Sequence, residues 1–236
     1  RGNDRAFQLA IGTLELCAEL NIPRSIVTIG TEENLDERNI DGLFKIAAQF
    51  ESNVRINILR PVKGCDLGPV KYETLKAILL HIIKHFHVVS MADPLVAALM
   101  GLSAVDPSGV GSFRILPDGD VTPSTFLTYH PWLATNIFVE TVDIEKLHLL
   151  PAFRELAWAK TPASCDGCQL ARKCQGGCKD RRIIWFNTLA ERDPYCPLRH
   201  DGKLEWLGNG NLKVATIPAE GPLIHNGYLP TLIFRP

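Results

Sequence analysis

The chain reads Cys-Asp-Gly-Cys-Gln-Leu-Ala-Arg-Lys-Cys-Gln-Gly-Gly-Cys from Cys165 to Cys178. These thiols follow the spacing C-x2-C-x5-C-x3-C, and a further thiol, Cys196, comes later in the chain. A cysteine that only packs in a core needs no partner at a fixed spacing. Thiolates this close together, with the small residues Gly176 and Gly177 between them, can converge on one soft metal centre. The stretch therefore indicates a structural zinc ion, an iron–sulfur cluster or disulfides.

The composition ranks these three options. The chain has 236 residues, a formal net charge of −1, 46% hydrophobic residues and seven cysteines. Such a chain is globular, and its near-neutral charge argues against a nucleic-acid partner. It has no apolar run long enough to cross a membrane and no export signal at its start, so we expect a cytoplasmic protein without a membrane partner. Disulfides are then the weakest option.

Helical and extended patterns alternate over the first hundred residues. The expected helices cover about 4–20, 35–50 and 72–86, and the expected strands cover 25–29, 54–59 and 87–91. Helices that alternate with short strands are typical of a parallel α/β fold with right-handed crossovers. Because this unit begins on a helix, we expect a part of a larger barrel or sheet.

Two polar segments, 30–34 and 60–64, follow the first two expected strands. In parallel α/β folds, ligands bind at the carboxyl ends of the strands. These segments can therefore hold a small polar ligand, or they can be ordinary loop and capping residues, with Asn34 starting the next helix. The residues alone favour the second interpretation.

The character of the sequence changes near residue 101, where Gly, Ser and Pro become frequent. Alternating residues then flank Asp118 and Gly119, which is a strong hairpin signal. Helical pieces are expected over 143–159, interrupted at Pro151. We expect three segments: an α/β part over 1–100, a cysteine-rich part over 101–200, and an irregular tail over 201–236.

The cysteine spacing resembles that of a known family. C-x2-C-x5-C-x3-C, with Gly-Gly before its fourth cysteine and Asp-Pro-Tyr-Cys ending at Cys196, resembles the SPASM extension of radical SAM enzymes. The hairpin over 115–123 is similar to the hairpin that precedes the clusters in that family, and residues 1–100 look like the second half of its partial barrel. The resemblance implies an α/β fold, in which half of a partial (β/α) TIM-like barrel precedes a small α+β, SPASM-like or twitch-like cysteine-rich domain.

The resemblance also implies a ligand set for one auxiliary 4Fe–4S cluster. In the family, the first three cysteines of the run and the distant last cysteine hold this cluster. Carried over by position, its ligands here are Cys165, Cys168, Cys174 and Cys196.

A second auxiliary cluster lacks its usual ligands in this sequence. The family holds it through the fourth cysteine of the run and cysteines near the hairpin, one of them at the end of a G-x4-C motif. Here the motif that begins at Gly119 ends at Ser124, and Ser108 to Gly111 stand where an upstream cysteine is usual. A serine alkoxide is a poor iron ligand beside a thiolate. We therefore expect a single auxiliary cluster, with Cys178 as a reduced, partly buried thiol.

The motif of the family's catalytic cluster is absent from this sequence. Radical SAM enzymes hold that cluster through C-x3-C-x2-C, and neither Cys17 nor Cys65 stands in such a run. Without it, S-adenosylmethionine cannot be bound at iron or cleaved reductively. Since the sequence starts on a helix and without Met, we expect the later portion of a longer enzyme. Its missing part would hold S-adenosylmethionine and a second 4Fe–4S cluster, and a degenerate relative is the alternative.

The resemblance gives the two strand ends a possible role. In the family, the fifth-strand region contacts the methionine part of S-adenosylmethionine, and the sixth contributes to the adenine site. The matching positions here are Thr28, Gly30, Glu32 and Asn34 in the first region, and Leu59, Arg60 and Pro61 in the second.

The implied activity is that of a radical SAM oxidoreductase or peptide maturase. In the family, a 5′-deoxyadenosyl radical abstracts a hydrogen atom from the substrate, and auxiliary clusters orient the substrate or accept an electron. We expect a ribosomal peptide or protein as the substrate, to be modified or cross-linked. A haem-pathway, sugar or other natural-product intermediate is the alternative substrate. An electron donor such as flavodoxin or ferredoxin is the expected partner.

A zinc-stabilised binding module without redox chemistry is the alternative from a different class. Four cysteines can bind zinc tetrahedrally, and the charged run Asp180-Arg181-Arg182 could engage a partner. The C-x5-C-x3-C part is unlike the paired C-x2-C motifs of zinc ribbons. Zinc is therefore the weaker interpretation.

Overall fold

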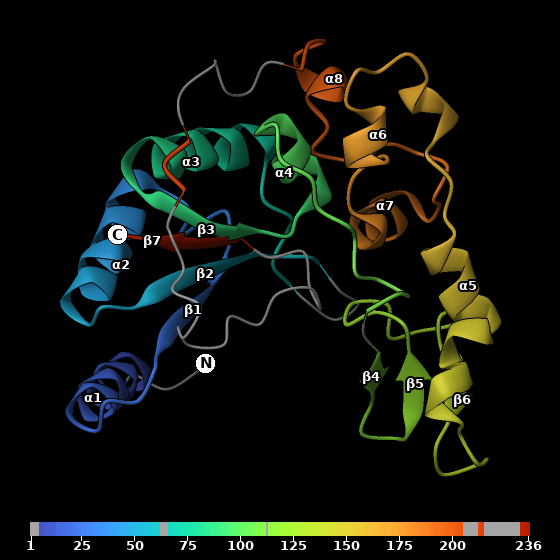
Figure 1. Ribbon diagram of the computed structural model, residues 1–236, viewed down its shortest axis with the longest axis horizontal. Coiled ribbons are helices and arrows are strands. Elements are labelled where there is room, and N and C mark those ends of the chain that lie inside the picture. Colours follow the sequence, from blue (N-terminus) through green and yellow to red (C-terminus); the bar gives the residue numbers. More distant parts are fainter. Residues whose placement is uncertain (1–4, 62–65, 112, 205–211, 215–231) are drawn as a thin grey trace.

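The computed structural model describes residues 5–61, 66–111, 113–204, 212–214 and 232–236 (Figure 1). Its first part alternates helices and strands: α1 (Ala6–Glu19), β1 (Ser25–Gly30), α2 (Glu37–Gln49), β2 (Asn53–Ile58), α3 (Tyr72–His85), β3 (His87–Met91) and α4 (Pro94–Leu99). The helices and strands expected in this part are confirmed to within two residues. The short helix α4 was not predicted.

The main sheet has the strand order β1-β2-β7-β3. Strands β1 and β2 are parallel, from Ser25 opposite Asn53 to Gly30 opposite Ile58. Strand β7 (Leu232–Arg235) lies between β2 and β3 and runs antiparallel to both. Two expectations are corrected here. The sheet is not wholly parallel, and the segment 201–236 is not irregular throughout, because its last residues form a strand inside the sheet.

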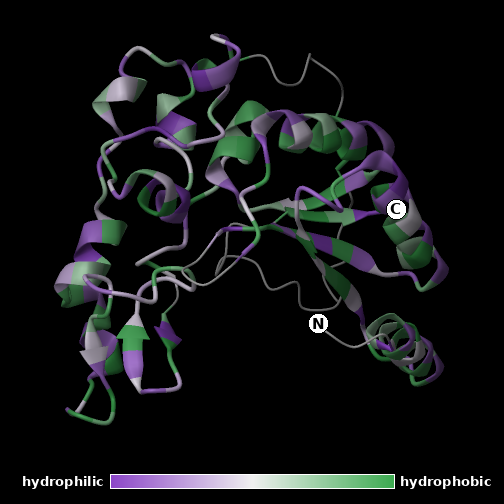
Figure 2. Ribbon diagram, turned by 180° about the vertical axis from the view of Figure 1, so that it is seen from behind, coloured by the Kyte–Doolittle hydropathy of each residue, from purple (hydrophilic) through white to green (hydrophobic). Residues whose placement is uncertain are grey.

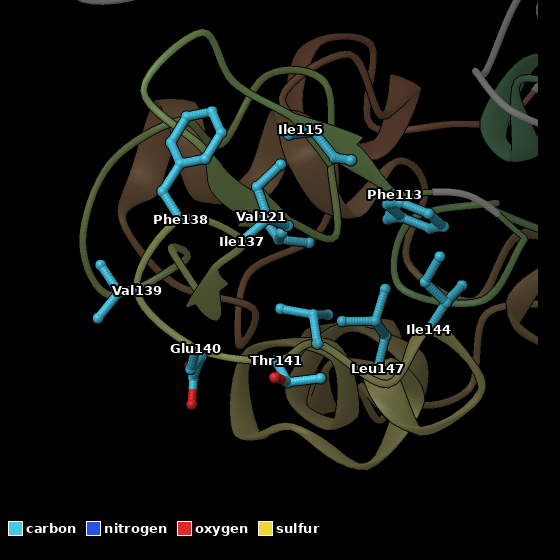
Figure 3. Close-up of a pocket in the computed structure, with 11 residues that line it drawn as sticks. Phe113, Ile115, Val121, Ile137, Phe138, Val139, Glu140, Thr141, Ile144 and Leu147 are labelled. Atoms are coloured by element: carbon cyan, nitrogen blue, oxygen red, sulfur yellow. The ribbon is translucent and has the colours of Figure 1, made fainter.

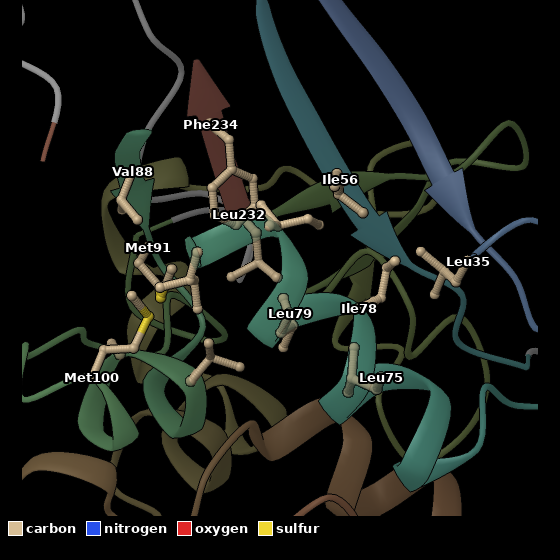
Figure 4. Packing of buried hydrophobic residues seen from close by; sticks show 14 of the residues in the cluster. Leu35, Ile56, Leu75, Ile78, Leu79, Val88, Met91, Met100, Leu232 and Phe234 are labelled. Atoms are coloured by element: carbon tan, nitrogen blue, oxygen red, sulfur yellow. The ribbon is translucent and has the colours of Figure 1, made fainter. Parts of the chain in front are cut away.

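One face of the sheet packs against α2 and α3 and forms the largest core. Apolar side chains of β2, β3 and β7, among them Ile56 and Phe234, meet the inner face of α3, where Leu75, Ile78 and Leu79 are buried (Figure 4). Amphipathic spacing predicted this face of α3 correctly. Core-facing and outward-facing residues alternate along these strands because successive side chains of a β-strand point to opposite faces of the sheet.

The opposite face of β2 is polar. Asn53, Arg55 and Asn57 alternate with the core residues Val54 and Ile56. Among the described residues, the Oδ1 atom of Asn57 has no hydrogen-bond partner, although it is buried. The sheet therefore divides an apolar helix-covered side from a polar side.

Helix α1 and the outer strand β1 expose much apolar surface. No residue of α1 is buried, and Phe7 is 65% exposed. On β1, Val27 and Ile29 are 58% and 55% exposed. Helix α1 stands apart from α2 and α3 (Figure 2). The helix is confirmed, but the described residues do not cover its apolar side.

The second part consists of short elements. Strands β4 (Arg114–Ile115), β5 (Asp120–Thr122) and β6 (Thr135–Asn136) form an antiparallel sheet. The predicted hairpin joins β4 to β5, and Gly119 at its turn has a φ of 88°, which favours glycine. The helices are η1 (Ile144–Leu149), α5 (Pro151–Ala157), η2 (Ala163–Cys165), α6 (Ala171–Cys174), α7 (Lys179–Phe186) and α8 (Pro197–His200).

The expected interruption at Pro151 is also confirmed. The 3-10 helix η1 ends at Leu149, and Pro151 is the first residue of α5, where a missing N–H costs nothing. Within the described ranges, no helix combines the length and the apolar character that a membrane crossing requires.

Candidate metal centre

Four cysteines line one pocket between α4 and the short helices of the second part. They are Cys165 at the end of η2, Cys168 in the following turn, Cys174 at the end of α6, and Cys196 just before α8. All except the half-buried Cys168 are buried. Leu95, Leu170 and Leu198 are among the other residues that line the pocket. The fold thus brings the four cysteines that match the family's cluster ligands to one apolar site.

The thiols of this pocket act on one another electrostatically. Burial is the main cause that raises the pKa of Cys165, and neighbouring Cys196 and Cys168 raise it further. Arg192 and Arg182 oppose this shift in the pKa of Cys165. Two guanidinium groups therefore stand near thiols that would carry negative charge as metal ligands.

Cys174 is the most strongly affected of these thiols. Burial raises its pKa far above the ordinary range, and the negative charges of Asp193 and Cys196 add to the shift. Without a cation, this thiol holds its proton at neutral pH. Binding of a metal would displace that proton, since thiolates are the form that ligates.

The arrangement can be tested against a single ion. Each Zn–S bond is about 2.3 Å, so tetrahedral zinc needs thiolates about 3.8 Å apart. Among the described residues, no three His, Cys, Asp or Glu side chains converge in a way that could hold one metal ion. A four-iron cluster binds each thiolate through a different iron atom and so separates its ligands more widely. The four cysteines therefore line one pocket without forming a preassembled single-ion site among the described residues.

Arg182 carries a second buried polar atom without a hydrogen-bond partner among the described residues. The Arg182 side chain is fully buried, and its Nε has no hydrogen-bond partner among the described residues. Its Nη1 donates to the backbone oxygen of Gln175 at 3.3 Å. A buried donor without an acceptor is costly. Asp193 is the charged group that acts most strongly on Arg182, and the charge of Arg182 in turn lowers the pKa of Cys165.

Cys178 lies apart from the other four thiols. It is fully buried, precedes the first residue of α7, and is not among the residues that line the cysteine pocket. Its backbone N–H donates to Asp193 Oδ2 at 2.8 Å. Burial raises the pKa of the Cys178 thiol well above its usual range, and the charged groups that act on it include Arg60 and Asp106.

The two glycines before Cys178 are needed for close packing. Gly176 and Gly177 have φ values of 87° and 84°. A Cβ atom on Gly176 would lie 2.4 Å from Nη1 of Arg182, and one on Gly177 would lie 2.4 Å from the Asp193 side chain. The Gly-Gly pair therefore lets the chain turn tightly against two buried charges.

The charged run at the start of α7 is buried. Lys179, Asp180, Arg181 and Arg182 are each at most 8% exposed. The idea that this run engages a partner is therefore wrong, because its side chains are buried inside the protein, where Asp180 and Arg181 have internal ion-pair partners. Sequence patterns assign such a run to the surface, and only long-range partners reveal the burial.

Arg181 forms ion pairs with two aspartates from different parts of the chain. Its Nη2 donates to Asp93 Oδ1 at 3.0 Å and to Asp193 Oδ2 at 2.7 Å. Asp93 also caps α4 by accepting from the backbone N–H groups of Leu95 and Val96. The ion pairs thus tie the α/β part to the cysteine segment.

Arg60 makes a second tie of this kind. It follows the end of β2, and its Nη1 lies 3.1 Å from Asp180 Oδ2 on α7. Its guanidinium also covers the Phe126 ring, with the central carbon 4.1 Å from the ring centroid. The structure shows a buried internal partner for this predicted ligand-contact residue.

The polar side chains after β1 also have structural partners. Glu32 accepts hydrogen bonds from the Lys71 N–H at 2.8 Å and the Thr74 hydroxyl at 2.9 Å, which fastens this loop to the start of α3. Asn34 accepts from the Thr31 N–H and donates to the Ile29 carbonyl. These bonds shape the loop.

The start of α2 corrects one expectation. Asn34 does not begin this helix. Asp36 is the cap, and its carboxylate accepts a hydrogen bond from the Asn39 N–H at 2.8 Å. Both residues are good capping types, so the sequence alone could not choose between them.

The remaining strand-end candidates lie near one another but not around the cysteines. Thr28 and Gly30 pair with Ile56 and Ile58, on the helix-covered face. A Cβ atom on Gly30 would lie 2.9 Å from the Leu35 side chain, which explains the glycine. The Leu59 N–H donates to the Gly30 carbonyl at 2.8 Å. Pro61 is half-buried and adjoins residues 62–65, which lie outside the described ranges.

A second, larger pocket lies on the hairpin sheet, at the far end of the second part from α6. Its volume is about 550 Å³, and its lining is mainly apolar, with Phe113, Ile115, Phe138 and Val139 among the residues (Figure 3). Phe138 is 74% exposed and Val139 is 83% exposed. Sequence reasoning did not identify this hollow, because its walls come from the hairpin and from the separate segment 137–147.

Neither a family model nor a curated protein matches this sequence. Solved structures do. One of them is a structure of anSMEcpe, an anaerobic sulfatase-maturating enzyme, with bound AdoMet and Kp18Cys peptide. It matches 80% of this chain with a TM-score of 0.61 and 21% identity. Streptococcus suis SuiB bound to S-adenosylmethionine matches with a TM-score of 0.57 and 17% identity over 79% of this chain.

The chain has a radical SAM/SPASM-type fold. This agrees with the resemblance found in the cysteine spacing. The chain spans 57% of the length of the anSMEcpe structure and 48% of SuiB, which is about half of each enzyme. At these identities the match establishes the fold, and the activity follows as a proposal.

Proposed function

We propose that this chain is a portion of a radical SAM/SPASM enzyme that modifies a peptide or protein and holds one auxiliary 4Fe–4S cluster. The observation that carries the proposal is the set of four cysteines around one apolar pocket, in a fold shared with enzymes that bind AdoMet. The proposed ligands are Cys165, Cys168, Cys174 and Cys196.

The protein side of this site is suited to a redox centre. Four thiolates would leave no iron open, so the cluster would transfer electrons or support the architecture and would not bind the substrate directly. The apolar wall that includes Leu95 and Leu198 limits access of water, and Arg192 and Arg182 offset negative charge. Burial and nearby charge are the means by which a protein adjusts a cluster's potential.

S-adenosylmethionine and the reducing cluster would be held by a C-x3-C-x2-C segment, which the printed sequence does not contain. We propose that this chain contributes to the S-adenosylmethionine site through the loops that follow β1 and β2. Thr28, Gly30, Glu32 and Asn34 shape the end of β1, and Leu59, Arg60 and Pro61 shape the end of β2. Since Glu32, Asn34 and Arg60 use their side chains within the protein, backbone groups of these loops are the better candidates for contact with the cofactor.

A peptide is the substrate that the observations favour. anSMEcpe, which shares this fold, has been solved with bound peptides. The exposed hollow around Phe138 offers apolar walls to which side chains of such a substrate can bind. Reduced flavodoxin or ferredoxin is the proposed electron donor.

The direct test is chemical analysis of the anaerobically purified protein. We expect a brown protein whose iron and acid-labile sulfide fall when Cys165 or Cys196 is replaced by Ala. A colourless protein that contains stoichiometric zinc would contradict the proposal and favour a zinc-stabilised module.

The substrate class needs its own experiment. The full-length enzyme that carries this chain, supplied with S-adenosylmethionine, a reductant and candidate peptides, should release 5′-deoxyadenosine that contains deuterium from a labelled peptide. The variant Phe138→Ser should raise the KM for the peptide without lowering the iron content, with Val105→Ser as an exposed apolar control outside the hollow. Label transfer only from a small-molecule substrate would overturn the peptide assignment.

A further inference from the structure

Ser124 and Cys178 match positions of a second cluster's ligands, and Ser108 belongs to the stretch where a further ligand is usual; all three are buried near Asp180. Ser108, Ser124 and Cys178 come from distant parts of the chain, and all are at most 4% exposed. The hydroxyls of both serines act on the carboxyl group of Asp180, and the charge of Asp180 acts on Cys178. The fold therefore brings one thiol and two hydroxyls close to the same carboxyl group, that of Asp180.

An ion pair stands at the centre of this site. Arg60 and Asp180 are 3.1 Å apart, with side chains that are 4% and 1% exposed. Asp106 closes the other side, because its carboxylate accepts from the Ser108 N–H at 2.9 Å and from the Lys179 N–H at 2.8 Å. We call this set of Arg60, Asp106, Ser108, Ser124 and Asp180 the polar core.

The polar core does not fit an iron–sulfur cluster. Such a cluster needs four thiolates or comparable soft donors, and the described residues here supply one thiol, Cys178. The carboxylate of Asp180 already has a counter-charge in Arg60, and its Oδ1 atom has no hydrogen-bond partner among the described residues. Burial raises the pKa of Asp180 to about 6, against the lowering effects of Arg60 and the serine hydroxyls, as expected for a carboxyl group that is packed inside the protein.

We propose that the polar core replaces the second auxiliary cluster and fastens the end of β2 to α7 without metal. The proposal rests on the proposed function only in naming the cluster that is replaced. Arg60 extends from the end of β2, Asp180 lies on α7, and Ser124 follows β5, so the polar core joins the α/β part to the cysteine segment and the hairpin sheet. Electrons in this half of the enzyme would then have the four-cysteine cluster as their single acceptor.

The first arm of the test measures how much the Arg60–Asp180 ion pair stabilises the protein. Replacing one partner of a buried ion pair leaves an unpaired charge, whereas an apolar pair of similar volume can be tolerated. Arg60→Met and Asp180→Leu should each lower the thermal midpoint by roughly 10 °C, and the double variant should regain at least half of the loss. The control Lys76→Met, which removes a more exposed pair with Asp201, should shift it by a few degrees at most.

The second arm measures the iron content of variants whose substitutions are small enough for the protein still to fold. Cys178→Ser, Ser124→Ala and Ser108→Ala should keep the iron and sulfide content of the unmodified protein. Loss of about four iron atoms in any of them would overturn the proposal, because it would reveal a second cluster. A double variant no more stable than the worse single variant would overturn the fastening role. Absence of iron in the unmodified protein would instead refute the proposed function and leave the midpoint test valid.

Discussion

The two sites supplied by the cysteine segment differ in what surrounds their thiols. At the first site, Cys165, Cys168, Cys174 and Cys196 share an apolar pocket with leucines and two nearby arginines. At the second, Cys178 is the single thiol among the described residues, and the groups near it are carboxylates, hydroxyls and the guanidinium groups of Arg60 and Arg181. One short motif therefore supplies thiols to two environments, and only the first suits a soft metal centre.

The difference arises outside the motif. The first site is completed by Cys196, which the turn that begins at Asp193 delivers next to α8. The second is completed by Arg60, Ser108 and Ser124, which come from the α/β part and the hairpin. Spacing identifies the family of the motif, but residues far away decide what each thiol does.

Removal of the cluster should have the largest effect on the first site. Anaerobic chelation of iron would leave four cysteine thiols, three of them buried, without the centre that they bind, and the segments that the cluster joins would separate more easily. We expect the thermal midpoint to fall by at least roughly 10 °C, measured by calorimetry before and after chelation. Equal midpoints would contradict the assignment of the four cysteines to one stabilising centre.

The second largest effect is expected from loss of the ion pairs of Arg181. Arg181→Met leaves Asp93 and Asp193 buried without their counter-charge and should lower the free energy of unfolding by about 3–5 kcal/mol. Denaturant titration measures this loss. The control Arg199→Met removes the exposed pair with Glu191 and should cost about 1 kcal/mol or less. Similar losses in the two variants would mean that the ion pairs of Arg181 do not hold the cysteine segment against the α/β part.

Glycine replacements separate backbone strain from packing. Gly177→Ala adds a Cβ atom 2.4 Å from the Asp193 side chain at a φ of 84°, whereas Gly167→Ala has a similar φ of 74° with nothing within 4 Å. Both should lose about 1–2 kcal/mol from strain, and Gly177→Ala should lose clearly more. If chemical denaturation gave the same loss for both, close packing on Asp193 would not explain the Gly-Gly pair.

The smallest effect is expected at Arg192. Its guanidinium lowers the pKa of both Cys165 and Cys196, so it stabilises negative charge in the cysteine pocket. Arg192→Met should keep the iron content but lower the cluster's reduction potential by tens of millivolts, because the reduced cluster carries more negative charge. Redox titration followed by EPR measures the shift, with the exposed Arg172→Met as control. A rise in potential would contradict this role.

The sequence was informative where structure is local. Helices α2 and α3, the hairpin turn at Gly119 and the break at Pro151 follow from spacing and turn residues within a few positions of each other. The four cysteines of the pocket matched a family pattern of fixed spacing. These signals do not depend on the rest of the chain.

Long-range pairing could not be predicted in the same way. Strand β7 enters the sheet between β2 and β3, more than one hundred residues away in the chain. The charges of Lys179 to Arg182 look like a solvent-exposed helix end, yet all four residues are buried, and Asp180 and Arg181 form ion pairs with Arg60, Asp93 and Asp193. Such partners are fixed by the tertiary fold, which no local pattern encodes.

The most direct test compares the iron content of two cysteine variants in the same segment. Cys174→Ala and Cys178→Ala remove neighbouring buried thiols of the C-x2-C-x5-C-x3-C run, so nonspecific effects on folding should be similar. We predict that Cys174→Ala loses the iron and sulfide of the auxiliary cluster, while Cys178→Ala retains them. Equal loss of iron in both variants would contradict the division of this segment into a cluster site and a metal-free polar core.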